Sequence, residues 1–405
     1  MPHVAPELQY LAAVVLLFVV PRVLQRFRVP SAITCVGGGA LAGMGFGLFH
    51  GDTAVPLLST LGIVSLFLFA GLEVDLRELR RNLRVVAEHL AVQVALLAGA
   101  AYAAWRLLHL DPRAAVLFAL AVVTPSTGFI LDSLGGFGLS ADHRFWVKTK
   151  AIATEIVALA ALFGTVRSGS AAELGLSTAA LLAMIAALPW AFRAFARHVL
   201  PHAPKSEFSF LVVVAATCAY ATRALGVYYL VGAFVVGVTA VRMRDSLPTL
   251  ASERVLDALE LFAKFFIPFY FFKAGLHLQA ADFSLRAVAL GLGLVAAVVP
   301  LKVLVVSVHR RLSLREPVRD GARVGLSLVP TLVFTIVIAD ILRERYALPP
   351  QLYGALLVYT LANTTLPGLL LRAPPPEFDA PEAPPSHAPA PVDNAPAAVA
   401  SPPPP

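Results

Sequence analysis

The stretch VLFALAVVTPSTGFILDSLG, residues 116–135, is long and apolar enough to cross a membrane, but a polar Thr-Pro-Ser-Thr-Gly segment interrupts its middle. A bilayer core of about 30 Å requires about 20 apolar residues in a helix. Pro125 removes a backbone donor, and Gly128 weakens the helix further. The carbonyls that lose their partners must then find donors within the protein, because lipid offers none. The stretch therefore predicts a broken transmembrane helix inside a larger bundle.

The rest of the chain has the composition of such a bundle. Of its 405 residues, 58% are hydrophobic and 14% charged, which excludes an ordinary water-soluble protein. About thirteen apolar runs follow one another, so the predicted fold class is an all-α polytopic membrane protein with about thirteen transmembrane helices. The predicted spans are 7–24, 31–49, 55–73, 84–105, 114–134, 146–166, 174–192, 207–223, 226–241, 257–276, 285–308, 321–342 and 351–371.

The formal charge of +7 is explained by the topology of a membrane protein and does not indicate a nucleic-acid partner. Basic residues gather in alternate loops, with about 21 on one side and about seven on the other. The positive-inside rule then predicts an external N-terminus and a cytoplasmic C-terminus. The apolar spans predict that membrane lipid surrounds the helices. We expect a multi-pass protein of a bacterial inner (plasma) membrane.

Two segments of different composition make up the chain. Residues 1–372 form the predicted transmembrane domain, and residues 373–405 are rich in Pro and Ala without apolar periodicity. Such a composition cannot bury a core, so the second segment is predicted to be a disordered cytoplasmic tail.

An internal repeat links the two halves of the membrane domain. The motif Ala-Gly-Leu occurs in FLFAGLEVDL at 67–76 and in FFKAGLHLQA at 271–280, and these copies lie 204 residues apart. Pro125 has a counterpart in Pro330, which interrupts VGLSLVPTLVFTIVIADIL 205 residues later. The copies end the third and the tenth predicted spans, which are seven crossings apart, and an odd separation means that the halves should run in opposite directions. We therefore predict inverted repeats, roughly helices 1–6 and 8–13, with two crossed broken helices around a binding site.

Glu155 lies near the middle of the apolar run 146–166. A carboxylate at the bilayer centre costs about 2.5 to 3.5 kcal/mol on insertion scales, so it should face the interior and carry a function. The alternative is a structural ion pair, for which Lys302 and Lys273 are the candidate charge partners. Three histidines lie at the ends of runs and predict no ligand set, namely His89, His109 and His277.

Several of these segments resemble those of a known protein family. The segments LFLFAGLEVDLRELRR (66–81) and GAFVVG (232–237), with an interrupted Thr-rich helix followed by a helix with a central acid, resemble the monovalent cation:proton antiporter-2 branch of the cation:proton antiporter superfamily. The resemblance covers roughly residues 7–371. It implies a homodimer in which one group of helices moves like an elevator against the other, and an antiporter fold with broken helices crossing beside an essential acid.

The resemblance also assigns roles to individual positions. The acidic pair of the family falls on Thr154-Glu155, its membrane lysine on Lys302, and its interrupted Thr-containing segment on residues 124–128. The chain departs from the pattern in having Thr at the first position of the pair and Glu, not Asp, at the second. It also has VPTLVF (329–334) where many potassium-efflux relatives have Gly-Glu-Phe.

The predicted function is secondary antiport of protons against Na⁺ or K⁺, with no cofactor beyond the transported ions. Glu155 would alternate between proton and cation, Thr124 would join it as a cation ligand, and Thr154, Ser126 and Thr127 would add oxygens suited to a hard cation. One acid without a second predicts one proton per cation, hence electroneutral exchange. The sequence contains no nucleophile-base set typical of an enzyme.

Two other functions stay open at this point. The same fold can carry an organic anion, with Lys302 and helix ends receiving a carboxylate. A membrane scaffold or sensor that does not transport is the second alternative, with the Pro-rich tail as its docking segment. Deletion of residues 374–405 separates these classes, because a scaffold should fail and an antiporter should still turn over.

Overall fold

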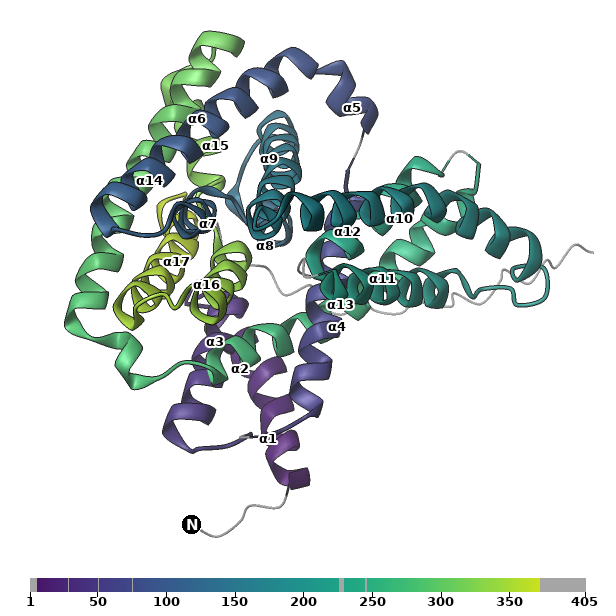
Figure 1. The fold of residues 1–405 in the computed structure, drawn as a ribbon, viewed down its shortest axis with the longest axis horizontal. Coiled ribbons are helices and arrows are strands. Elements are labelled where there is room, and N and C mark those ends of the chain that lie inside the picture. Colours follow the sequence, from purple (N-terminus) through teal and green to yellow (C-terminus); the bar gives the residue numbers. More distant parts are fainter. Residues whose placement is uncertain are drawn as a thin grey trace, which may run out of the picture. The chain divides into compact units, whose positions relative to one another are not determined.

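The computed structural model describes residues 6–27, 29–49, 51–74, 76–225, 229–244 and 246–371, which all belong to one unit. Within these ranges the chain is helical and has no strands (Figure 1). The α-helices are α1 (Pro6–Phe18), α2 (Val20–Gln25), α3 (Ser31–Ala40), α4 (Ala54–Leu72), α5 (Leu76–Arg81), α6 (Leu83–Leu108), α7 (Pro112–Val123), α8 (Thr127–Ser133), α9 (Ala141–Arg167), α10 (Ala171–His198), α11 (Glu207–Ala224), α12 (Tyr229–Arg242), α13 (Glu253–Leu276), α14 (Leu285–Leu314), α15 (Val318–Ser327), α16 (Leu332–Tyr346) and α17 (Pro350–Leu370). Short turns of other helix types are η1 (Leu41–Gly45), η2 (Leu134–Phe137), η3 (Pro248–Ala251) and η4 (Ala280–Phe283).

The predicted fold class is confirmed, but the number of crossings is not. A helix or a pair of helices occupies each predicted span within the described ranges. Among these described residues, eight helices are long and apolar enough to cross a membrane, or nine when the bent pair α15 and α16 counts as one span. The prediction of about thirteen therefore exceeds what length and composition support in the structure. The predicted tail, residues 373–405, lies outside the described residues.

Close contacts between glycines hold the first set of helices, α1–α4 and α11–α13, which we call the glycine-packed group. Here α4 packs against α12 and α13, and α13 packs against α3. Gly71 of the first Ala-Gly-Leu motif meets Gly237 on α12, and Gly275 of the second meets Gly39 on α3. The two copies of the motif thus perform the same packing, because only a residue without Cβ lets the helix backbones approach so closely.

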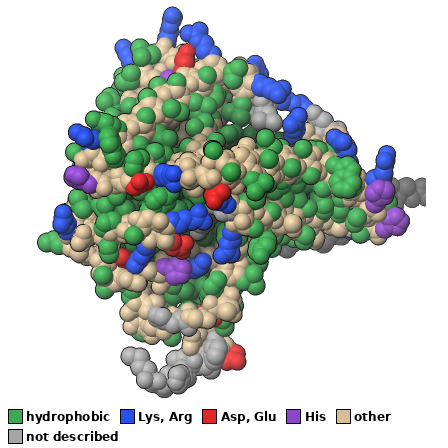
Figure 2. All heavy atoms as spheres, in the orientation of Figure 1, with side chains coloured by type: hydrophobic (Ala, Val, Ile, Leu, Met, Phe, Trp, Pro, Cys, Tyr) green, Lys and Arg blue, Asp and Glu red, His purple; other side chains and the backbone are tan. Residues whose placement is uncertain are grey.

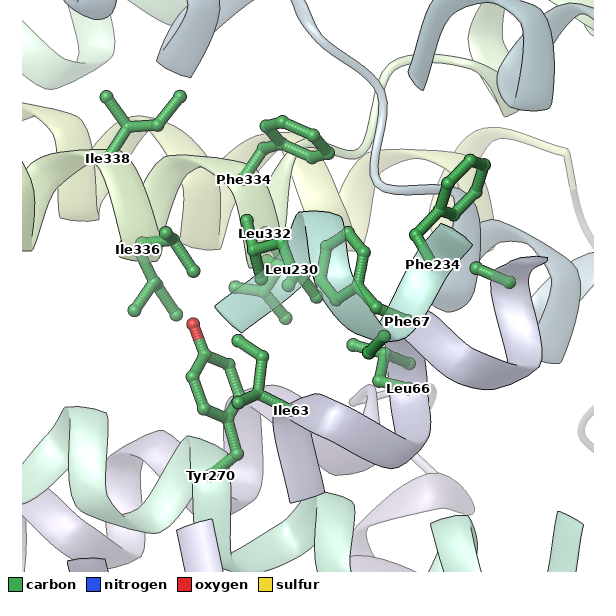
Figure 3. Close-up of a cluster of buried hydrophobic side chains, with 14 of the residues drawn as sticks. Ile63, Leu66, Phe67, Leu230, Phe234, Tyr270, Leu332, Phe334, Ile336 and Ile338 are labelled. Atoms are coloured by element: carbon green, nitrogen blue, oxygen red, sulfur yellow. The ribbon is translucent and has the colours of Figure 1, made fainter. Parts of the chain in front are cut away.

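The second set of helices, α6–α9 and α14–α17, contains both interrupted helices, and we call it the crossing group. In it α14 packs against α15 and α17, α6 against α7, and α16 against α7 and α17. The two groups meet through apolar side chains of α4, α12, α13 and α16 (Figure 3). Phe67 and Phe334 make an edge-to-face contact there, with ring centroids 6.1 Å apart.

The outer surface suits a lipid environment. Apolar side chains cover much of the face drawn in Figure 2. Large apolar residues that would be costly to expose to water stand out from the helices, such as Leu107 on α6 and Trp190 on α10, which are more than two-thirds exposed. Such side chains are stable where they face lipid tails or a second membrane subunit.

We expect Gly71→Ala to destabilise the protein by about 1 to 3 kcal/mol, because the added methyl group would collide with the Phe234 backbone carbonyl of α12. Thermal unfolding in detergent measures the loss. Gly99→Ala on α6 is the matched control, since nothing lies within contact distance of its new methyl group. Equal unfolding temperatures for the two variants would contradict the proposed glycine packing.

Candidate functional site

The two interrupted helices meet at their breaks. α7 ends at Val123 and α8 begins at Thr127, with extended backbone at Thr124 and Ser126 between them. α15 and α16 are bent by 50° where Pro330 separates them. The Ser126 amide donates to the Pro330 carbonyl at 2.8 Å, and the Val333 amide donates to Ser126 Oγ at 3.4 Å. The two predicted breakers, Pro125 and Pro330, therefore lie within one hydrogen-bonded junction.

Two backbone carbonyls near the end of α7 lose their amide donors at the break. They accept hydrogen bonds from side chains of the other repeat instead. Pro125 has no amide to offer Ala121, and the Ser126 amide points to Pro330 instead of Val122. Thr335 Oγ1 donates to the Ala121 carbonyl at 2.7 Å. The Tyr359 hydroxyl donates to the Val122 carbonyl at 2.6 Å. Both side chains are fully buried, so they supply the hydrogen bonds that lipid cannot.

Lys302 serves the other broken helix. Its ammonium donates to the Val329 carbonyl at 3.1 Å, just beyond the end of α15, and the side chain is 3% exposed. The C-terminal end of a helix carries partial negative charge, which compensates a buried cation there. Asn363 completes this end by accepting from the Thr331 amide and donating to Thr331 Oγ1. Among the described residues, no ion pair joins Lys302 to Glu155.

Glu155 lies inside the crossing group, as its sequence position predicts. Its side chain is 2% exposed, and Oε2 is buried without a hydrogen-bond partner. The Thr127 side chain interacts with this carboxylate, but its Oγ1 is likewise buried and makes no hydrogen bond of regular geometry. Two buried oxygens thus face one another at the start of α8 with unfilled bonding capacity. Gly128, the next residue of α8, lets α8 pack closely on α4, because a Cβ there would lie 2.5 Å from the Leu66 side chain.

Thr124 and Thr154 line a pocket beside the break. The pocket has a volume of about 20 Å³, room for about one water-sized species, and lies between α6, α7 and α9. Gln93 of α6 is its third polar wall residue. Thr154 Oγ1 also lies 3.2 Å from Nε2 of His89, one turn before Gln93 on α6. The structure therefore brings Thr124 and Thr154 together, with Glu155 on a neighbouring face of α9.

His89 and Gln93 are functional candidates that the sequence interpretation missed. The sequence interpretation assigned His89 no role because it lies near the end of a run, and the structure shows it buried against Thr154 of α9. It belongs to a network in which its ring lies 5.8 Å from that of His309, and His309 Nδ1 lies 2.9 Å from Lys150 Nζ. A signal was present, because His89 and Gln93 are four residues apart and share one helix face.

Lys273 lies in a different environment from the acid it was predicted to accompany. It is near the end of α13, and its electrostatic neighbours include His277 and Asp340. Asp340 in turn accepts from the Tyr353 hydroxyl at 3.1 Å. The structure thus does not bring Lys273 to the junction of the broken helices.

Comparison with known proteins agrees with this architecture. The sequence model of the family described as "Sodium/hydrogen exchanger, transmembrane" matches residues 13–374, which is most of the chain. The chain belongs to the sodium/hydrogen exchanger family. Its fold is similar to that of the sodium proton antiporter MjNhaP1 from Methanocaldococcus jannaschii, with a TM-score of 0.62 and 12% identity, over 90% of this chain and 94% of that one. No curated protein matches the sequence significantly.

Membership of the exchanger family places the protein in the cation:proton antiporter superfamily and confirms it as a multi-pass membrane protein. The family and the fold are those of transporters rather than enzymes. In many transporters built from inverted repeats, the substrate and ion sites lie where discontinuous helices meet near the middle of the membrane.

Removing one donor to the freed carbonyls should destabilise the exchanger. We expect Thr335→Val and Tyr359→Phe each to lose about 1 to 3 kcal/mol, since each leaves a buried carbonyl of α7 unsatisfied. Thermal unfolding in detergent is the readout. Thr217→Val is the control, because Thr217 is exposed and bonds only a carbonyl of its own helix. Losses no larger than that of the control would contradict this account of the junction.

Proposed function

We propose that the protein exchanges protons for Na⁺ or K⁺ across the membrane, with Glu155 carrying one or the other in turn. The observation that supports this most directly is the buried carboxylate with an unpartnered oxygen beside the unpartnered Thr127 hydroxyl. A bare carboxylate is unstable in a membrane interior, so a proton or a monovalent cation must neutralise it. Either ion alone neutralises the negative charge of the carboxylate, and both together would leave an uncompensated positive charge. Binding of one therefore favours release of the other.

Oxygens around the break supply the remaining ligands in this proposal. Glu155 and Thr127 contribute the carboxylate and one hydroxyl, and Thr124 and Thr154 are close by on the pocket side of the junction. Ser126 holds the crossing in place, because its amide donates to the Pro330 carbonyl between α15 and α16 and its Oγ accepts from the Val333 amide of α16. Hard alkali cations prefer such oxygen ligands, and they need no cofactor or resident metal.

Helix motion is proposed to move the site between the two sides. The surface between the groups is formed by apolar side chains such as Ile63 and Phe67 on α4, Phe234 on α12, and Phe334 and Ile336 on α16 (Figure 3). Apolar contacts are not directional, so the crossing group can slide along these side chains, and the movement has to break the ion pair between Lys148 of α9 and Glu73 at the end of α4. We propose an elevator-like movement of this kind in a homodimer, with the C-terminus in the cytoplasm of a bacterial cell.

We expect Glu155→Gln to abolish cation-driven proton movement in proteoliposomes that contain a pH-sensitive dye. The amide keeps the size of the side chain but cannot exchange a proton for a cation. Glu155→Asp should retain exchange with an altered KM, because the charge remains and the carboxylate is displaced by one methylene. Glu260→Gln on the surface of α13 is the control and should leave turnover within about twofold of wild type.

A dye response in Glu155→Gln equal to that of wild type would contradict the proposal. Absence of any response to Na⁺ or K⁺ in wild type would instead favour an organic-anion carrier or a membrane scaffold.

The proposed stoichiometry of one proton per cation gives a second test. Lys302 is held by a carbonyl and a helix end, so Glu155 is the group that changes its bound ion during the cycle. At mildly alkaline pH, we expect the initial exchange rate in proteoliposomes to be the same with and without an imposed membrane potential. A rate that rises with inside-negative potential would contradict electroneutral exchange and assign a second moving charge to the crossing group.

A further inference from the structure

Three unpartnered buried oxygens surround the break between α7 and α8. Two belong to Glu155 and Thr127, where the proposed function places the exchanged ion. The third is Oε1 of Gln93 on α6, whose side chain is 6% exposed. A buried amide oxygen without a partner costs about 1 to 3 kcal/mol, so its position requires an explanation.

Gln93 lies against a pocket that has the right size and lining for a small cation. The hydroxyl-bearing residues Thr124 of α7 and Thr154 of α9 line the same pocket. The remaining wall is apolar, with Leu97, Leu120 and Val123 among its residues. Its volume of about 20 Å³ leaves room for about one water-sized species.

The polar groups next to the pocket leave oxygen lone pairs available. His89 contacts Thr154 Oγ1 from the same α6 face as Gln93, and a neutral imidazole can accept the hydroxyl proton there. The Thr154 oxygen would then keep its lone pairs for the pocket. The pocket residues themselves include no charged side chain, so its oxygen ligands are all neutral.

We propose that Gln93 joins Thr124 and Thr154 in a neutral subsite for the transported monovalent cation, which extends the Glu155 site on the α6 side of the break. The inference rests on the proposed exchange function and extends it. Glu155 and Thr127 lie across the same junction, so a cation held by Gln93 is one step from the carboxylate that exchanges it for a proton. Neutral oxygens strip water from the cation without binding it so strongly that it cannot move on.

The subsite predicts a specific kinetic signature. Gln93→Met keeps the length of the side chain and removes the oxygen, so cation KM should rise about tenfold, as expected for the loss of one ligand to a charged group. Turnover at saturating cation should stay within about twofold of wild type, because Glu155 still exchanges its proton. The increase in KM should differ between Li⁺, Na⁺ and K⁺, since a site of fixed size discriminates by ionic radius.

The test compares Gln93→Met with Gln351→Leu in proteoliposomes, using KM and turnover for each of the three cations. Gln351 is exposed on α17, outside the pocket, and its variant should behave like wild type. A raised KM with preserved turnover in Gln93→Met alone supports the subsite. An unchanged KM, or a fall in turnover that is equal for all three cations, overturns it and makes Gln93 a packing residue.

Two further readouts keep this inference separate from the proposed function. If wild type shows no cation-driven proton movement, the exchange function fails, whereas exchange with an indifferent Gln93→Met removes only the subsite. If the variant does not fold, crystals of the wild-type protein soaked in Tl⁺ test the subsite instead, because anomalous scattering locates the bound Tl⁺. A peak in contact with Gln93 Oε1 supports the proposal, and a peak at Glu155 alone overturns it.

Discussion

Every part of this structure depends on how backbone carbonyls are satisfied where two helices are broken inside a membrane. Pro125 frees carbonyls at the end of α7, and lipid has no donor for them. Thr335 and Tyr359 reach across from the other repeat to supply the missing hydrogen bonds. Lys302 does the same at the end of α15. The crossing is thus held by donors from distant parts of the chain, and these contacts force α7, α14, α16 and α17 to pack together.

This requirement divides the polar residues near the junction into two kinds. Thr335, Tyr359 and Asn363 have complete hydrogen bonds and hold the backbone. Glu155 and Thr127 each have a buried oxygen without a partner. Groups of the first kind fix the geometry, and groups of the second kind keep bonding capacity that the proposed function assigns to an ion. A transport site needs both, because a site whose oxygens were all satisfied internally would gain nothing from binding a cation.

The sequence predicted the elements of this junction but not its contacts. Proline removes a donor wherever it stands, so Pro125 and Pro330 identified both breaks, and the repeated Ala-Gly-Leu motif identified two helices that pack alike through Gly71 and Gly275. Which donor reaches which carbonyl depends on how distant helices pack. For that reason Lys302 was assigned to Glu155 although it bonds Val329, and the burial of His89 was missed. The number of crossings was not confirmed, because several of the helices in the described part of the chain are too short or too polar to count as spans by length and composition.

The central claim is that one carboxylate, Glu155, gives up a proton when the cation binds. Proton release from purified protein in weakly buffered detergent solution tests it most directly, with cation binding followed in parallel by thermal stabilisation. At mildly acidic pH, where the carboxyl holds its proton before the cation binds, we expect Na⁺ or K⁺ binding to release up to about one proton per cation, and Glu155→Gln to release none. Cation binding to the wild type without proton release would contradict the account.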